Sequence, residues 1–218
     1  MIGLLLPTAL ALLAALAAGG SPARLAHARM QWWWVVVGAF GLELVLYNPP
    51  VDTQPWALSI GPWLWVATKL AMLAALARNA RADRAAAWPW LLMILGIGLN
   101  TVVIVANGGH MPQSVEAAAA VWGPRHAGPD AYPGRLQNVA VLGPDSRLTW
   151  LADVLAEPAW LPRPNVLSIG DVLLAFGMAG WVFSVIHGGA RPEAGRVRSV
   201  HAEPPTRRSQ LASPPAVS

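Results

Sequence analysis

Five long apolar stretches dominate the hydrophobic pattern of the chain. They run over residues 2–18, 32–47, 56–77, 88–106 and 168–186. Each approaches the roughly 20 residues that a helix needs to cross the hydrocarbon core of a bilayer. The pattern therefore predicts an all-α fold: a polytopic bundle of about five transmembrane helices with a partly helical outer loop.

A few polar side chains interrupt these stretches: Glu43, Lys69, Asn100 and, near a helix start, Asp171. A rise of 1.5 Å per residue places Glu43 about 6 Å and Lys69 about 20 Å below the outer ends of their helices. We therefore expect no direct Glu43–Lys69 ion pair. Lys69 is instead expected to snorkel inward or to bond a carbonyl of a neighbouring helix.

The longest polar segment covers residues 107–167 and separates the last two stretches. Ser114 is a suitable N-cap for a short helix over Val115–Trp122. A second short helix is predicted over Arg147–Leu155, where apolar residues recur at helical spacing. The Gly/Pro-rich stretch between them, residues 123–134, is expected to be irregular. Together these features predict a loop that folds over the mouth of the bundle.

Two units follow from this organisation. Residues 1–188 form a five-span transmembrane domain that includes the outer loop 107–167. Residues 189–218 are rich in Pro, Arg, Ser and Ala and have no apolar period. This composition predicts a disordered basic tail on the cytoplasmic side.

Charge placement predicts the orientation. Only 12% of the residues are charged, about half the usual share, and the net charge is +4. Under a five-span arrangement, ten of the 15 Lys and Arg residues fall on one side, which should be cytoplasmic. This basic excess is a topology signal, and no nucleic-acid partner is expected. Because no basic residue precedes the first stretch, we interpret it as a retained span with its N-terminus outside. The ten residues are Arg24, Arg29, Arg78, Arg81, Arg84, Arg191, Arg196, Arg198, Arg207 and Arg208.

Recognised catalytic and metal-binding patterns are missing from the sequence. The chain has no cysteine, no H-E-x-x-H motif and no D-x-D-x-D-G loop. Its serines lack the nucleophile-elbow context of a hydrolase. We predict no catalytic residue, no metal site and no cofactor from the sequence.

Polar residues gather where the fourth helix should end and the fifth should begin. Asn107, Gly108 and Gly109 fit a helix C-cap, because asparagine and glycine tolerate a left-handed backbone. Ser168 and Asp171 fit a capping box at the start of the fifth helix. Asn100 should bond another helix or a water-filled cavity. The candidate cluster, for a ligand or for structure alone, comprises Glu43, Asn100, Asn107, Gly108, Gly109, His110, Asp153, Ser168 and Asp171.

Three parts of the sequence carry a family resemblance: Leu99–Pro112, which contains A-N-G-G-H-M-P; Leu151–Val154, which reads L-A-D-V; and Ser168–Leu173, which contains S-I-G-D-V. They resemble the motifs of a bacterial multi-pass membrane protein family known only as a domain of unknown function. The resemblance covers about residues 1–187. It implies a bacterial cell (inner) membrane protein, and it implies no activity.

On these grounds we predict a non-enzymatic accessory, sensory or scaffold component whose outward-facing polar cluster meets a partner or small ligand. The first alternative is a small transporter or channel with Glu43, Asn100 and Asp171 along a polar path. The second alternative is a membrane-embedded enzyme that uses Asp153, Asp171 and His110 as acid and base. Besides the lipid bilayer, a membrane-protein partner or a second copy of the chain is a candidate for association.

Overall fold

A computed structural model of the protein describes residues 2–84, 87–127 and 133–187. The predicted tail, residues 189–218, lies outside the described residues, as does part of the Gly/Pro-rich stretch. The described chain is mostly helical, as predicted. Its seven α-helices are α1 (Ile2–Ala17), α2 (Ala23–His27), α3 (Trp33–Leu46), α4 (Pro55–Ala82), α5 (Ala87–Ala106), α6 (Val115–Trp122) and α7 (Ile169–His187).

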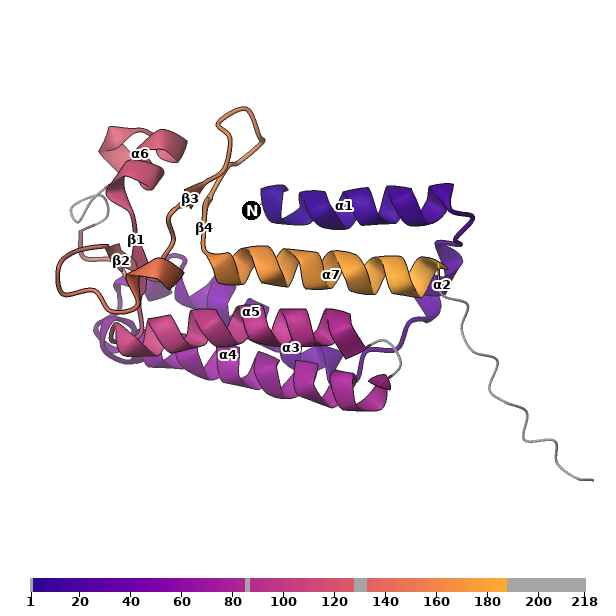
Figure 1. Ribbon diagram of the computed structural model, residues 1–218. Helices are drawn as coiled ribbons and strands as arrows, with labels where there is room; N and C mark the ends of the chain where they lie inside the picture. The colour runs from indigo at the N-terminus through magenta and orange to yellow at the C-terminus, as the bar shows by residue number, and fades with distance from the viewer. Residues whose placement is uncertain (1, 85–86, 128–132, 188–218) are drawn as a thin grey trace, which may run out of the picture.

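Five of these helices lie side by side and form the body of the molecule (Figure 1). They begin and end within a few residues of the predicted stretches, except that α4 extends to Ala82. Three of them, α4, α5 and α7, are long and apolar enough to cross a membrane. The apolar helices α1 and α3 have 16 and 14 residues and are shorter than that.

The helices α5 and α7 pack closely and run antiparallel. A Cβ at Gly96 would clash with the backbone oxygen of Gly170 and would lie 2.8 Å from the backbone nitrogen of Leu174. Further along, Gly177 faces Met93, and Gly180 faces the Trp88 ring. Because a side chain at Gly96 has no room, glycine at this position sets the distance between the two helix backbones.

The helices α3 and α4 also run antiparallel, but the end of α3 and the start of α4 are not level. The ring of Tyr47, just after α3, makes an edge contact with Trp65 at a centroid distance of 6.0 Å. Trp65 lies ten residues into α4, so α4 extends about 15 Å beyond the end of α3. These extra turns are covered by the short 3₁₀ helix Val51–Thr53 and by the side chain of Leu136, which lies against Gly61.

The long loop forms a small cap at one end of the helical body (Figure 1). Its helix α6 and the Ser114 cap are as predicted: Ser114 Oγ accepts from the backbone nitrogen of Ala117. The predicted helix over Arg147–Leu155 is wrong. The chain there forms a 3₁₀ helix, Thr149–Leu151, because Leu148 has a left-handed backbone (φ 54°) that interrupts an α-helix.

The cap also contains four short strands that the sequence analysis did not predict. Strand β1 (Met111–Gln113) pairs in parallel with β2 (Val139–Val141), and β3 (Leu155–Ala156) pairs antiparallel with β4 (Val166–Leu167). Strands of two or three residues are too short for an alternating pattern to reveal them. They form two separate two-stranded sheets, which join distant parts of the loop beside the ends of α5 and α7.

The opposite end of the body is held by polar contacts between chain segments. The Asn79 side chain accepts from the backbone nitrogen of Gln31 and donates to its carbonyl oxygen, both at 2.8 Å. Arg24 donates to the carbonyls of Ile186 and His187, at 3.0 and 3.1 Å. The arginines near α2 and those at the end of α4 therefore share this end of the molecule.

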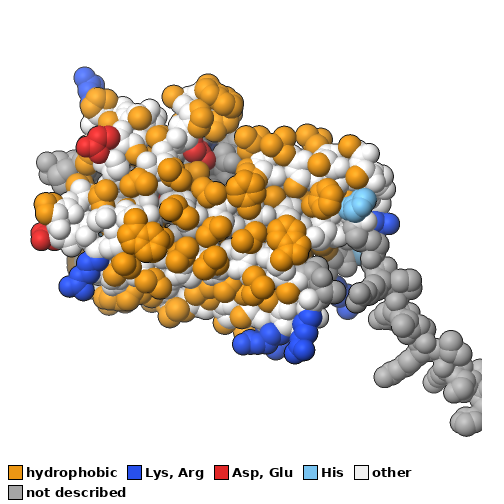
Figure 2. All heavy atoms as spheres, in the orientation of Figure 1, with side chains coloured by type: hydrophobic (Ala, Val, Ile, Leu, Met, Phe, Trp, Pro, Cys, Tyr) orange, Lys and Arg blue, Asp and Glu red, His pale blue; other side chains and the backbone are white. Residues whose placement is uncertain are grey.

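Apolar side chains cover the outside of the helical body. On the face drawn in Figure 2 they spread over the helices, whereas the acidic side chains that are visible lie over the cap. A soluble domain would bury such a surface or carry it only in small patches. Exposed large apolar residues occur on all five long helices, among them Leu10, Leu13, Trp34, Phe40, Leu44, Ile60, Trp63, Leu70, Leu91, Leu95, Val102 and Phe176.

Candidate functional site

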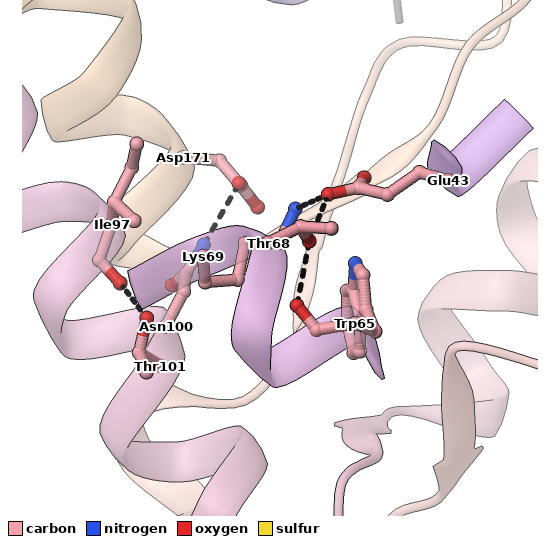
Figure 3. A network of polar contacts seen from close by, with 8 residues as sticks. All are labelled: Glu43, Trp65, Thr68, Lys69, Ile97, Asn100, Thr101 and Asp171. Carbon is pink, nitrogen blue, oxygen red and sulfur yellow. Dashed lines mark hydrogen bonds and ion pairs between the residues drawn. The ribbon is translucent and has the colours of Figure 1, made fainter. Parts of the chain in front are cut away.

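Asn100 links α5 to the first turn of α7. Ser168 and Asp171 form the predicted capping box: the backbone nitrogen of Ser168 donates to Asp171 Oδ2 at 2.9 Å, and that of Asp171 donates to Ser168 Oγ at 3.0 Å. Asn100 Nδ2 donates to Asp171 Oδ1 at 3.0 Å, and Asn100 Oδ1 lies 2.9 Å from Ser168 Oγ. The predicted helix-to-helix bond of Asn100 is confirmed, and the capping carboxylate is its partner (Figure 3).

The expectation that Glu43 and Lys69 do not meet is wrong. Lys69 Nζ lies 2.7 Å from Glu43 Oε1, which also accepts from the hydroxyl of Thr68 at 2.7 Å (Figure 3). The depth count assumed level helix ends, but α4 begins about 15 Å beyond α3. In addition, side chains lean toward the N-terminus of their own helix. Because α3 and α4 are antiparallel, Lys69 and Glu43 therefore reach toward each other.

The turn after α5 is the predicted C-cap. Gly108 and Gly109 have φ values of +68° and +90°, and the backbone nitrogen of Gly109 donates to the carbonyl of Ile104 at 2.9 Å. Asn107 also bonds both backbone groups of Arg147, accepting from its nitrogen at 2.8 Å and donating to its oxygen at 3.0 Å. This turn therefore attaches the distant segment around Arg147 to the end of α5.

A cleft of about 980 Å³ opens in the cap. Its walls come from β1, β2, α6, the first turn of α4 and the segment that precedes β2. Polar and apolar side chains both line it, a mixture that is typical of small-molecule sites. The polar ones are His110, Gln113, Ser114, Arg135, Gln137, Asn138, Asp153 and Asn165, and the larger apolar ones are Leu58, Val115, Trp122, Leu136, Val139 and Val141.

Asp153 is the acidic residue of this cleft, and its backbone is fixed on both sides. Its nitrogen donates to the carbonyl of Pro112, and its carbonyl accepts from the nitrogen of Ser114, both at 2.9 Å. The residue is only 9% exposed. Its carboxyl group bonds the side chain of Gln113, whereas Oδ1 is buried without a hydrogen-bond partner in the described structure. Such an unsatisfied buried oxygen costs stability and needs an explanation.

The environment of Asp153 favours its protonated form. Burial and, secondly, the nearby charge of Asp171 raise the pKa of Asp153 to about 8, and the bond from Gln113 opposes this only in part. Burial also lowers the pKa of His110, which lines the same cleft. At neutral pH the cleft therefore holds a carboxyl group that can gain or lose a proton and an imidazole that is mainly neutral.

Arg135 brings a positive charge to the cleft wall, but it is already paired. Its Nε donates to Asp52 Oδ2 at 2.6 Å, and its Nη2 forms an ion pair with the same oxygen. Asp52 is 1% exposed and lies in the 3₁₀ helix between α3 and α4. The guanidinium therefore neutralises a buried carboxylate and attaches the cleft wall to the helical body.

The nine predicted candidates thus fall into four places. Asn100, Ser168 and Asp171 meet; Asn107, Gly108 and Gly109 form a turn; His110 and Asp153 line the cleft; and Glu43 pairs with Lys69. Asn107 and Asp171 lie at different levels of the helical body. Asp171 bonds Asn100, which precedes Asn107 by seven residues, or about 10 Å along α5.

Several cleft residues were missed by the sequence analysis, notably Gln113, Arg135, Asn138 and Asn165. They lie in irregular or very short elements, where no periodic pattern marks them. Across residues 2–84, 87–127 and 133–187, no three His, Asp or Glu side chains are close enough to hold a metal ion. The described part of the site is therefore one for hydrogen bonds and a single buried carboxyl group.

Comparison with protein families gives a match over residues 27–183, to a family of unknown function (DUF5317). The matched region includes α3 to α6, the whole cap and most of α7. No curated protein and no solved structure matches the chain.

Proposed function

Since the chain belongs to the DUF5317 family of unknown function, we propose from its own geometry that it is a membrane-anchored recognition component. In this proposal five helices hold the protein in a bacterial cell membrane. The cap faces outward and binds a small polar ligand. The role is non-enzymatic, as an accessory, sensory or scaffold protein. The observation that carries the proposal is the 980 Å³ cleft with the buried, partly unpartnered Asp153 carboxyl group.

The five-span arrangement rests on the apolar outer surfaces of all five long helices. At 1.5 Å per residue, α1 and α3 are about 24 and 21 Å long, whereas the hydrocarbon core is about 30 Å thick. A short span is accommodated by local thinning of the bilayer and by flanking residues. Trp33 and Trp34, both exposed at the start of α3, are suitable interfacial residues.

The proposed orientation rests on the two ends of the body. Arg24, Arg78 and Arg81 lie at the end opposite the cap, and an excess of arginine favours the cytoplasmic side. The chain has no cysteine, so single cysteines can report sidedness in intact cells. A membrane-impermeant maleimide should label Asp145→Cys in the cap and should label Arg81→Cys only after the membrane is opened. The reverse pattern would contradict the orientation.

Ligand binding is tested by purification from native membranes in mild detergent, followed by mass spectrometry of bound molecules. The parent protein and the control Asp145→Asn, an exposed aspartate of the cap that does not line the cleft, should carry the same small molecule. Asp153→Asn should lose it. A scaffold role would be favoured instead if the parent and both variants carry no small molecule and all three retain the same stoichiometric protein partner.

An enzyme is the second candidate, because Asp153 and His110 line the same cleft. A carboxyl group with a pKa of about 8 and a neutral imidazole are suitable for proton transfer near neutral pH. This alternative requires turnover of a bound molecule that both Asp153→Asn and His110→Ala abolish. A transporter has less support. Glu43 is bonded to Lys69 of α4, Asn100 and Asp171 are bonded to each other, and none of these three proposed path residues lines the cleft.

A further inference from the structure

We propose that the cleft takes a small organic cation, whose ammonium group pairs with the Asp153 carboxylate; this inference rests on the proposed ligand-binding role of the cap. The starting point is the unpartnered Asp153 Oδ1, which is buried and belongs to a residue that lines the cleft. The backbone bonds to Pro112 and Ser114 hold the residue in place. These bonds fix the main chain of Asp153, and with it the base of the side chain, beside the cleft.

Within the described residues, Asp153 forms no ion pair. A second carboxyl group, that of Asp171, is close enough to disfavour the ionised form of Asp153. Arg135 is the arginine among the described residues that line the cleft, and it is paired with Asp52. Two close carboxyl groups repel an anionic ligand, whereas a cation is attracted to both.

The rest of the cleft indicates which kind of cation fits. A metal ion needs several oxygen or nitrogen ligands, and the described residues offer no group of three His, Asp or Glu side chains. Leu58, Val115 and Val139 supply apolar surface, and side-chain amides of Gln113, Asn138 and Asn165 supply hydrogen-bonding groups. An amine with a partly apolar body matches these walls. The volume of about 980 Å³ is large enough for a drug-sized molecule.

Binding of an ammonium group requires the carboxyl group to ionise, so binding should release a proton and should strengthen as the pH rises through about 8. The other ionisable groups on the surrounding elements are Asp171 on α7, Glu116 on α6, His110 before β1, Glu157 after β3 and the Arg135–Asp52 pair. Of these, Asp171 contributes to the raised pKa of Asp153. His110 should be mainly neutral over the range from pH 6.5 to 8.5, because burial lowers its pKa.

Three probes that share a phenyl group and a short chain separate the charge classes: phenethylammonium, 2-phenylethanol and 3-phenylpropanoate. Their binding to the full chain, in nanodiscs of uncharged lipid, is measured by saturation-transfer NMR. Phenethylammonium should bind the parent and Asp145→Asn, and its affinity should fall at least about tenfold in Asp153→Asn. Between pH 6.5 and 8.5 its affinity for the parent should rise by at least about fivefold. The carboxylate probe should not bind.

The outcomes separate this inference from the proposed function. Two outcomes overturn the cation inference but not the ligand-binding role. The first is equal binding of 2-phenylethanol and phenethylammonium, and the second is binding of phenethylammonium that Asp153→Asn leaves unchanged. Absence of ammonium binding at about 10 mM also overturns it, because a charge-paired fragment should bind in the millimolar range. If, in addition, no molecule co-purifies with the parent protein, the ligand-binding role fails as well. Thermal unfolding of each variant shows whether it is folded.

Discussion

Lys69 Nζ lies 2.7 Å from Glu43 Oε1, and this ion pair joins α3 to α4 in the apolar body of the protein. The ammonium also lies 5.1 Å from the centroid of the Trp65 ring, and Thr68 donates to the same carboxylate oxygen. Apolar contacts also join the two helices, in a cluster that contains Ala39 of α3 and Met72 and Leu76 of α4. The ion pair, with its fixed geometry, is therefore well placed to set how far α4 extends beyond α3.

Breaking this pair on one side should destabilise the protein more than removing both charges. Lys69→Met leaves the Glu43 carboxylate without its counter-ion, and uncompensated charges of this kind cost about 3–5 kcal/mol. The double variant Glu43→Gln/Lys69→Met should recover most of the loss, because the remaining groups are neutral. Thermal unfolding in a fixed detergent measures both. A double variant as unstable as Lys69→Met would contradict this account.

The contact between α5 and α7 predicts unequal effects of adding one methyl group at two glycines of α5. Gly96→Ala should destabilise by about 1–3 kcal/mol, because the new Cβ meets the backbone of Gly170 and Leu174, which cannot move aside. Gly98→Ala is the matched control, since no atom lies within 4 Å of its Cβ position. It should be neutral or slightly stabilising, because alanine favours a helix. Thermal unfolding in detergent measures both variants. Similar midpoint temperatures for Gly96→Ala and Gly98→Ala would argue against the close approach of the α5 and α7 backbones.

Ser168 has two roles, as the N-cap of α7 and as a hydrogen-bond partner of Asn100 on α5. Its loss should therefore destabilise both helices. Ser168→Ala should cost about 1–2 kcal/mol, the usual range for a cap. It should also speed hydrogen exchange at the start of α7, where the backbone nitrogen of Asp171 loses its acceptor. Ser59→Ala, at an exposed serine that bonds only its own helix turn, is the control. Equal exchange rates at Asp171 in both variants would refute the capping role.

Asp153 should make the stability of the cap decrease as the pH rises. Its folded pKa of about 8 exceeds the ordinary value of 3.8, so the folded state binds the extra proton between these values, and the free energy of unfolding falls over that interval. Asp153→Asn removes this dependence. The variant should match the parent near pH 4 and be more stable at pH 8, by on the order of a few kcal/mol at most. If the difference in stability between the parent and Asp153→Asn is the same at pH 4 and pH 8, the buried carboxyl group is not the source of the pH dependence.

The sequence was informative where a repeated pattern spans several helical turns. It was uninformative where the structure depends on single contacts between distant segments. Hydrophobic runs located all five long helices, and capping chemistry identified the roles of Ser114, Ser168 and Asp171. The Glu43–Lys69 pair was missed because it depends on the offset between α3 and α4, which the eight residues between them do not reveal. The cleft was missed because its walls are brought together by strands of two or three residues that lie far apart in the chain.

The pairing of α1 with α7 has a consequence for how the protein is made. The Ala15 side chain packs with Val182 and Ile186, and Gly20 fits against Ile186. At typical rates of synthesis, α7 emerges roughly 10–30 s after α1. During that time α1 lacks the helix on which it packs. Completion of the bundle therefore waits for the last helix, and this long-range contact makes α1 the segment most exposed to competing partners during biosynthesis.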